Sequence, residues 1–192
     1  MILALCLLLQ DALDPAELYP LKEGTSWTYV SDKSEGRVRI AGKQKVGDAE
    51  CTVVETTGAR GVAREYVTVG KDGLLMHRTE RDKAPPEDYA PPVVRLKPGA
   101  RKGDSWEWKG KAGGQDAVFT FTNEGLEDVT VPAGAFKAWR VKVVTTHAGA
   151  RITGTNWYAP GVGIVRQENA IEMPDGKKRT STLELKSHEA VK

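Results

Sequence analysis

The chain has 192 residues, of which 40% are hydrophobic and 28% charged, so it is long enough to build one domain with a real core and is not a disordered polymer. Its 28 basic and 26 acidic side chains leave a net charge of +2, which gives no electrostatic argument for nucleic acid or an acidic membrane surface as a partner. Twenty Gly, ten Pro and few helix-favouring runs predict short strands joined by turns.

The chain begins with an unbroken apolar run, Ile2 to Leu9, which is too short to cross a bilayer as a helix. This run has the character of a signal-peptide core, so residues 1–12 are predicted to be a leader cleaved near Ala12 from a periplasmic or secreted protein. No basic residue precedes the run, which favours a true start upstream of Met1. Lipid anchoring through Cys6 is the less favoured alternative, because Leu5 stands where a small residue normally precedes the modified cysteine.

Past the leader, Asp14 is placed to cap one helical turn that ends at Leu18. Residues 18–188 are predicted to form a single antiparallel β domain with little helix, and Cys51 is predicted to be a small buried residue of a strand. Gly73 and Gly176 close two predicted hairpin turns. The predicted strands are Thr25 to Ser31, Arg37 to Lys45, Glu50 to Thr57, Ala63 to Val69, Gly73 to Thr79, Ser105 to Lys109, Ala117 to Thr122, Glu127 to Val131, Ala135 to Thr146, Arg151 to Tyr158, Gly163 to Ile171 and Lys178 to Lys186.

A proline-rich connection at residues 81–92 divides the chain near its middle, and a similar element occurs on either side of it. In both places a glycine turn opens a strand that reads Ser-Trp-x-aromatic. The period of two places Trp27 with Tyr29, and Trp106 with Trp108, on one face of their strands. We therefore expect two similar halves of one sheet, not two independent domains.

Four segments together resemble a known group of proteins: Tyr19 to Gly24 with Trp27 and Tyr29, Gly103 to Trp106, Val129 to Phe136, and Trp157 to Val165. The group consists of uncharacterised exported bacterial proteins, a domain-of-unknown-function family with a lipoprotein-carrier-like, open β-barrel fold. The resemblance implies a long curved antiparallel sheet that forms an open half-barrel, and a location in the cell envelope. It implies no established activity.

No catalytic or metal-binding constellation is visible in the sequence. The three histidines, His77, His147 and His188, are far apart and lack other metal-ligand residues at the required spacing, so neither a metal nor a cofactor is expected. The carboxylates around Gly125 are interpreted as a solvated turn, and the basic run that follows Gly176 as a hairpin tip with no nucleic-acid footprint.

The remaining indication of function comes from the aromatic side chains of the predicted strands. Most are interpreted as core, while Trp27, Tyr29, Trp106 and Trp108 are the candidate ligand-binding residues on the concave face. The first hypothesis is a non-catalytic envelope or secreted module that binds a lipophilic ligand. The alternative is a structural protein that docks to an envelope partner through a sheet edge or face, and an enzyme ranks third. The mature chain contains no predicted transmembrane segment, and its sequence does not indicate an oligomeric state.

Overall fold

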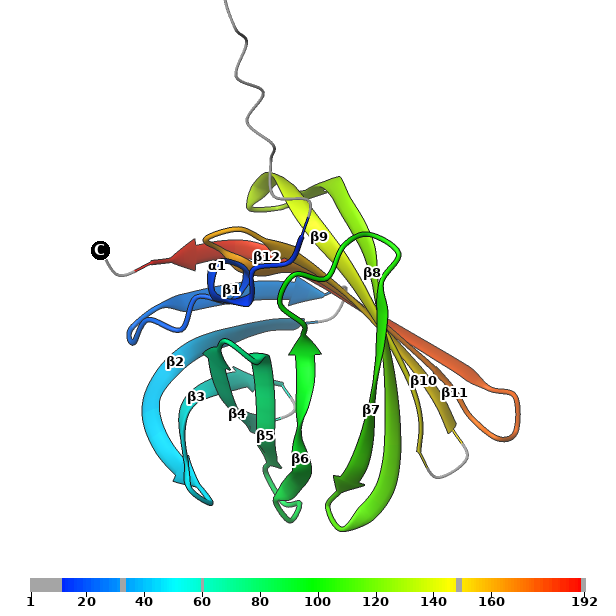
Figure 1. Cartoon of the computed structure of the whole chain (residues 1–192). Coiled ribbons are helices and arrows are strands. Elements are labelled where there is room, and N and C mark those ends of the chain that lie inside the picture. Colours follow the sequence, from blue (N-terminus) through cyan, green and yellow to red (C-terminus); the bar gives the residue numbers. More distant parts are fainter. Residues whose placement is uncertain (1–11, 32–33, 60, 148–149, 191–192) are drawn as a thin grey trace, which may run out of the picture.

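A computed structural model describes residues 12–31, 34–59, 61–147 and 150–190, so the predicted leader core and Cys6 lie outside the described residues. One short helix is followed by a meander of antiparallel strands (Figure 1). The elements are α1 (Pro15–Leu18), β1 (Ser26–Ser31), β2 (Ser34–Val46), β3 (Ala49–Gly58), β4 (Gly61–Gly70), β5 (Gly73–Arg81), β6 (Glu87–Leu96), β7 (Ser105–Ala112), β8 (Gln115–Val131), β9 (Gly134–His147), β10 (Ala150–Ala159), β11 (Gly163–Glu172) and β12 (Lys178–Glu189).

The strands form a closed barrel, which corrects the expected open half-barrel. Each strand pairs with its neighbour in the chain, and β1 also pairs with β12, so that Ser26 lies opposite Glu189. A twisted sheet of this many strands curls far enough for its first and last strands to meet, and their pairing removes both free edges. The all-β, antiparallel character expected from the sequence is confirmed.

Alternation of side chains follows the predicted period of two. On β3, for example, Val54 joins the main core inside the barrel, whereas Cys51 and Val53 form a second cluster with Tyr66 of β4. Cys51 is fully buried there, as the sequence predicted. The turns that contain Gly73 and Gly176 also join the strands that the sequence assigned to them.

Two predicted boundaries were wrong. The connection predicted at residues 81–92 is shorter, because β6 starts at Glu87 and continues through Pro91 and Pro92. The carboxylate-flanked turn predicted at Gly125 is a β-bulge inside the single long strand β8. At that bulge the fully buried Asn123 side chain accepts a hydrogen bond from the Gly125 N–H and donates one to the Ala100 carbonyl, so the strand continues where a turn was expected.

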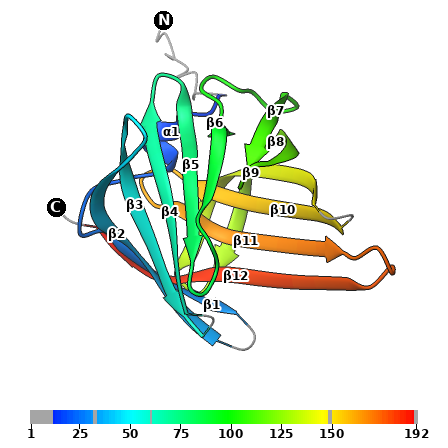
Figure 2. The same ribbon diagram turned by 90° about the horizontal axis from the view of Figure 1, so that it is seen from below.

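The segment before β1 covers one end of the barrel. Asp14 caps α1 as predicted, accepting a hydrogen bond from the Ala16 N–H. Leu13 exchanges backbone hydrogen bonds with the loop between β6 and β7, and its side chain and that of Leu18 are buried in the main core. Figure 2 shows α1 beside the upper ends of β4 and β5, which it contacts. The opposite end of the barrel has no such helix among the described residues.

Candidate functional site

Two adjoining cavities lie inside the barrel. The first has a volume of about 160 Å³, and the second one of about 140 Å³. Both are partly open to solvent, and they share Glu65, Arg95 and Gln167 as lining residues. The first cavity is also lined by Trp27, Tyr29, Val38, Val54 and Ile164, and the second by Met76, Val93, Phe119, Phe121, Val141 and Tyr158. The interior is therefore mainly apolar, with a polar group at the boundary between the two cavities.

An ion pair forms that boundary. A guanidinium nitrogen of Arg95, on β6, lies 2.6 Å from a carboxylate oxygen of Glu65, on β4. The Arg95 side chain is 13% exposed, but that of Glu65 is 37% exposed, so solvent reaches the pair from the Glu65 side. Burial is the largest single influence on the pKa of Arg95 and lowers it, but the charge and hydrogen bond of Glu65 together with the neighbouring Tyr158 and Tyr19 outweigh burial, so this pKa lies well above its ordinary value. The interior thus holds a permanent positive charge with a partly solvated counter-ion.

Two tyrosines adjoin the guanidinium. The Arg95 guanidinium carbon lies 5.9 Å from the centre of the Tyr19 ring, and this ring meets that of Tyr158 edge to face at a distance of 6.4 Å. Burial raises the pKa of both phenols, and the Arg95 charge only partly offsets this effect, so both hydroxyls stay protonated at neutral pH. Tyr158 is 1% exposed, and a hydrogen bond from the Arg95 guanidinium to its hydroxyl is part of the offsetting effect that lowers its pKa.

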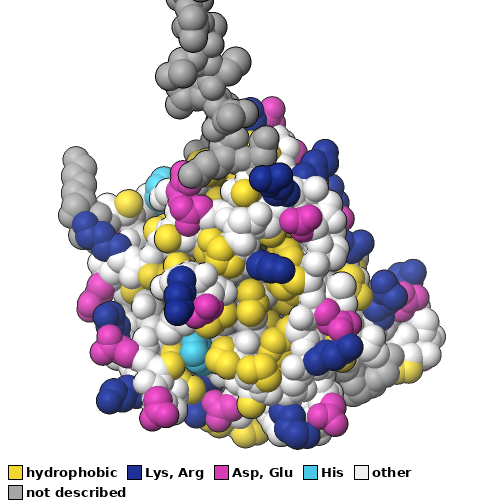
Figure 3. Space-filling model, viewed as in Figure 1, with side chains coloured by type: hydrophobic (Ala, Val, Ile, Leu, Met, Phe, Trp, Pro, Cys, Tyr) yellow, Lys and Arg dark blue, Asp and Glu magenta, His cyan; other side chains and the backbone are white. Residues whose placement is uncertain are grey.

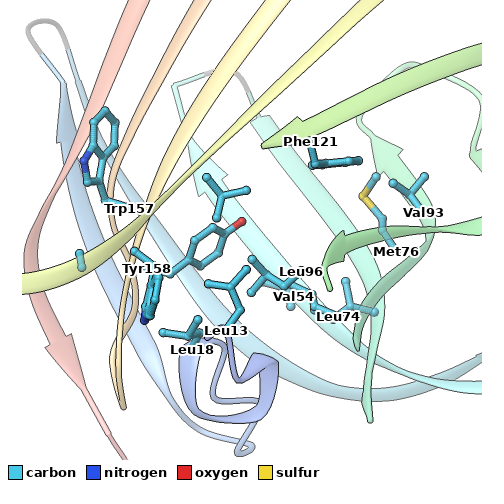
Figure 4. Close-up of a cluster of buried hydrophobic side chains, with 14 of the residues drawn as sticks. Leu13, Leu18, Val54, Leu74, Met76, Val93, Leu96, Phe121, Trp157 and Tyr158 are labelled. Atoms are coloured by element: carbon cyan, nitrogen blue, oxygen red, sulfur yellow. The ribbon is translucent and has the colours of Figure 1, made fainter. Parts of the chain in front are cut away.

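The side chains of β10 show which of its faces is the inner one. Figure 4 shows Tyr158 directed into the cluster of buried side chains and Trp157 projecting to the other side of the strand. Trp157 lies between Arg140 and Arg166, whose guanidinium carbons are 5.4 and 5.3 Å from its ring centre. The outer face of β10 is therefore covered by a cation–π stack, while its inner face lines the cavity.

The four candidate ligand-binding residues divide into two pairs. Trp27 and Tyr29 line the first cavity. Trp27 donates a hydrogen bond over 2.6 Å to the carbonyl of Val162, in the turn before β11, and Tyr29 donates one over 2.7 Å to the carbonyl of Ile164, in β11. Trp106 and Trp108 are buried but do not line either cavity. They pack against Phe121 and Phe119, which do line the second one.

Trp106 and Trp108 instead connect β7 to β6. Within the described chain these strands share two backbone pairs, Tyr89 with Ala112 and Ala90 with Lys111. Beyond those pairs the indole N–H groups donate to the Val94 and Pro91 carbonyls, each over 2.9 Å. We call this boundary the β6–β7 seam.

Figure 3 shows hydrophobic side chains gathered across the middle of the face on which β4 to β6 lie in Figure 1.

The remaining sequence candidates lie outside the cavities. His77 forms a hydrogen bond with Thr68 over 2.9 Å, and His188 is an exposed residue of β12. The side chain of His147 lies outside the described residues. No group of three or more potential metal ligands occurs in the described part of the chain.

Sequence reasoning missed Glu65, Arg95 and Tyr158. The sequence did indicate that Glu65 is unusual. It lies on the same face of its strand as Val67, and the other residues of that face are apolar. Arg95 follows Val93 and Val94 in an apolar run, but the run was not recognised as a strand.

The chain is similar to several known proteins. A model of the DUF3108-like family matches residues 117–181, and no curated protein matches the chain. A candidate exported protein with a YmcC-like fold from Bacteroides fragilis superposes with a TM-score of 0.52 at 18% identity, over 90% of this chain and 99% of that one. A candidate lipoprotein from Parabacteroides distasonis gives 0.44 at 16% identity, over 92% and 100% of the two chains.

The predicted resemblance to uncharacterised exported proteins is thereby confirmed, and the similarity to the Bacteroides protein supports the fold. Among the described residues, no helix has the length and apolar character needed to span a membrane.

Proposed function

We propose that this protein is a non-catalytic envelope or secreted module that binds a small lipophilic molecule inside its barrel. The observation that carries the proposal is the pair of adjoining, mainly apolar cavities that meet at Glu65 and Arg95. Ligand sites commonly combine apolar walls with a few convergent polar groups, and barrels of moderate size often enclose one small ligand. Each cavity is about half of the roughly 300 Å³ at which such sites begin, so the two together suit a small ligand.

Closure of the barrel weighs against one form of the alternative function. A docking protein that recruits a partner strand needs an unpaired sheet edge. Both edges of β1 are paired, and at the β6–β7 seam, where the described strands share two backbone pairs, the Trp106 and Trp108 indoles occupy two β6 carbonyls. Docking through an outer face is compatible with the fold, but the described outer surface has few large exposed hydrophobic residues, namely Val118, Leu126 and Met173. The interior cavities therefore provide the stronger support for a function.

The proposal is tested by binding of a neutral naphthylamine probe, whose fluorescence rises in apolar surroundings. Val143→Phe adds a ring to the wall of the second cavity and is expected to weaken probe binding by roughly tenfold. Val118→Phe, on a side chain that is 41% exposed, makes the same chemical change outside the cavities and is the matched control. Equal binding to the wild type and both variants, or no binding to any of them, would refute a ligand site in the barrel.

A further inference from the structure

The boundary between the two cavities has unused hydrogen-bonding capacity. A guanidinium carries five N–H donors, and the hydrogen bonds from Arg95 to Glu65 and to the Tyr19 and Tyr158 hydroxyls leave donors unused. The Tyr158 hydroxyl lines the second cavity beside this guanidinium and accepts a hydrogen bond from it, so the proton of the hydroxyl is left to donate. Several donors thus converge on one place, and the group they suit is an acceptor.

The two members of the ion pair differ in how well solvent can stabilise each charge when the pair separates. The Glu65 side chain is 37% exposed, so its carboxylate keeps much of its hydration when it turns away from Arg95. The Arg95 side chain is 13% exposed, and a buried cation left without a counter-charge is costly. A ligand that displaces Glu65 must therefore bring its own negative charge to Arg95.

We propose that Arg95 and Tyr158 form the head-group subsite for an amphipathic carboxylate, such as a medium-chain fatty acid. In the bound state the ligand carboxylate accepts hydrogen bonds from the Arg95 guanidinium and the Tyr158 hydroxyl, while Glu65 turns toward solvent. The apolar chain lies in the second cavity, between Met76 and Phe121. This inference rests on the proposed function and specifies its ligand class.

The dimensions of the cavities suit such a molecule. A water-sized group occupies about 30 Å³ in a condensed phase, so the second cavity, of about 140 Å³, holds roughly five such groups, and the rest of a ten-carbon chain extends through the opening of this cavity. Decanoate is therefore the probe of choice. Decanol and decyltrimethylammonium have the same chain with a neutral or a positive head, and they isolate the contribution of charge.

The experiment measures displacement of the neutral naphthylamine probe by these three amphiphiles. For the wild type, decanoate is expected to bind roughly tenfold more tightly than decanol, and decyltrimethylammonium more weakly than either. Arg95→Gln and Tyr158→Phe are expected to reduce the preference for decanoate. Glu65→Gln removes the competing carboxylate and is expected to strengthen decanoate binding without changing that of decanol.

Glu55→Gln is the matched control for Glu65→Gln. Glu55 also pairs with arginines, Arg39 and Arg64, but its strand position places it on the opposite face from Val54 and outside both cavities. This variant is expected to leave all three affinities unchanged. Tyr158→Phe keeps the buried ring and serves as the test if Arg95→Gln fails to fold.

The outcomes separate the head-group subsite from the proposed function. Equal binding of decanoate and decanol, or weaker decanoate binding by Glu65→Gln, overturns the carboxylate subsite but leaves a lipophilic cavity. Preference for decyltrimethylammonium assigns the head group to Glu65 and also overturns the subsite. Failure of the naphthylamine probe itself to bind overturns the proposed function.

Discussion

Replacing Trp106 or Trp108 by Phe tests whether indole N–H groups hold the β6–β7 seam together. Each replacement keeps an aromatic ring but removes the donor to a β6 carbonyl. Loss of one hydrogen bond costs about 0.5–1.5 kcal/mol, and leaving the acceptor buried and unsatisfied raises the cost to about 1–3 kcal/mol. The smaller ring adds a packing term, so we expect each variant to lose about 2–4 kcal/mol of unfolding free energy.

Trp139→Phe supplies the reference for that packing term. Trp139 is buried in the same core, but its indole N–H makes no hydrogen bond within the described residues. Urea unfolding followed by circular dichroism is the suitable assay, since fluorescence would change with the loss of a tryptophan. A difference of 2 kcal/mol between variants corresponds to about 4–8 °C in Tm for a domain of this size. If Trp106→Phe and Trp108→Phe cost no more than Trp139→Phe, the hydrogen bonds across the seam contribute nothing and the reasoning is refuted.

Three further predictions concern stability. Trp27→Ala and Trp106→Ala should each cost about 3–5 kcal/mol in chemical denaturation because both rings are buried, and unchanged midpoints would show the rings to be peripheral. Gly110→Ala should cost about 1–3 kcal/mol, since its Cβ would lie 2.5 Å from a β6 carbonyl oxygen, whereas Gly70→Ala meets no atom within 4 Å and should be nearly neutral. Hydrogen bonds from Arg39, the larger effect, and from Arg64 lower the pKa of Glu55 below its ordinary 4.5. The stabilising contribution of this carboxylate is therefore present above pH 4.5 and lost as the pH falls through the lowered value. The stability difference between the wild type and Glu55→Gln should therefore shrink below pH 4.5 in urea titrations, and a constant difference would contradict this assignment.

The sequence was most informative where strands alternate and turns carry glycine. It was least informative at β6 and β8. Pro91 and Pro92 signal a break because they cannot donate to a ladder, yet β6 tolerates them where the Trp108 indole, and not a backbone ladder, links it to β7. In β8, the residues around Gly125 have the composition of a turn, but in the structure they form a β-bulge and the strand continues beyond it.

The repeated Ser-Trp-x-aromatic element was recognised from the sequence, but its role was not. Each copy places its first tryptophan as the second residue of a strand, and β1 and β7 lie six positions apart in the closed barrel order of twelve strands. Both aromatic pairs donate hydrogen bonds to backbone carbonyls in other strands or, for Trp27, in the turn before β11. Spacing along the chain reveals which rings share a face, whereas the acceptor carbonyls lie on strands whose positions depend on barrel closure.

The polar part of the site could not be derived from local patterns, because Glu65 and Arg95 lie 30 residues apart and meet across β5. A charged residue among apolar residues on one face of a strand indicates that a charge faces the core, but it does not identify the residue that pairs with that charge. That partner depends on which strands stand two apart in the sheet.

Closure through β1 and β12 also has consequences for how the chain folds. Ser26 and Glu189 pair although 163 residues separate them, so the ring is completed only when nearly the whole sequence is present. The hairpins between chain neighbours are local and can form early, whereas contacts of such long sequence separation favour slow folding. Until β12 docks, β1 and β11 present unpaired edges that are open to association with other chains. A truncation that removes β12 should therefore yield an aggregation-prone sheet and not a slightly smaller barrel.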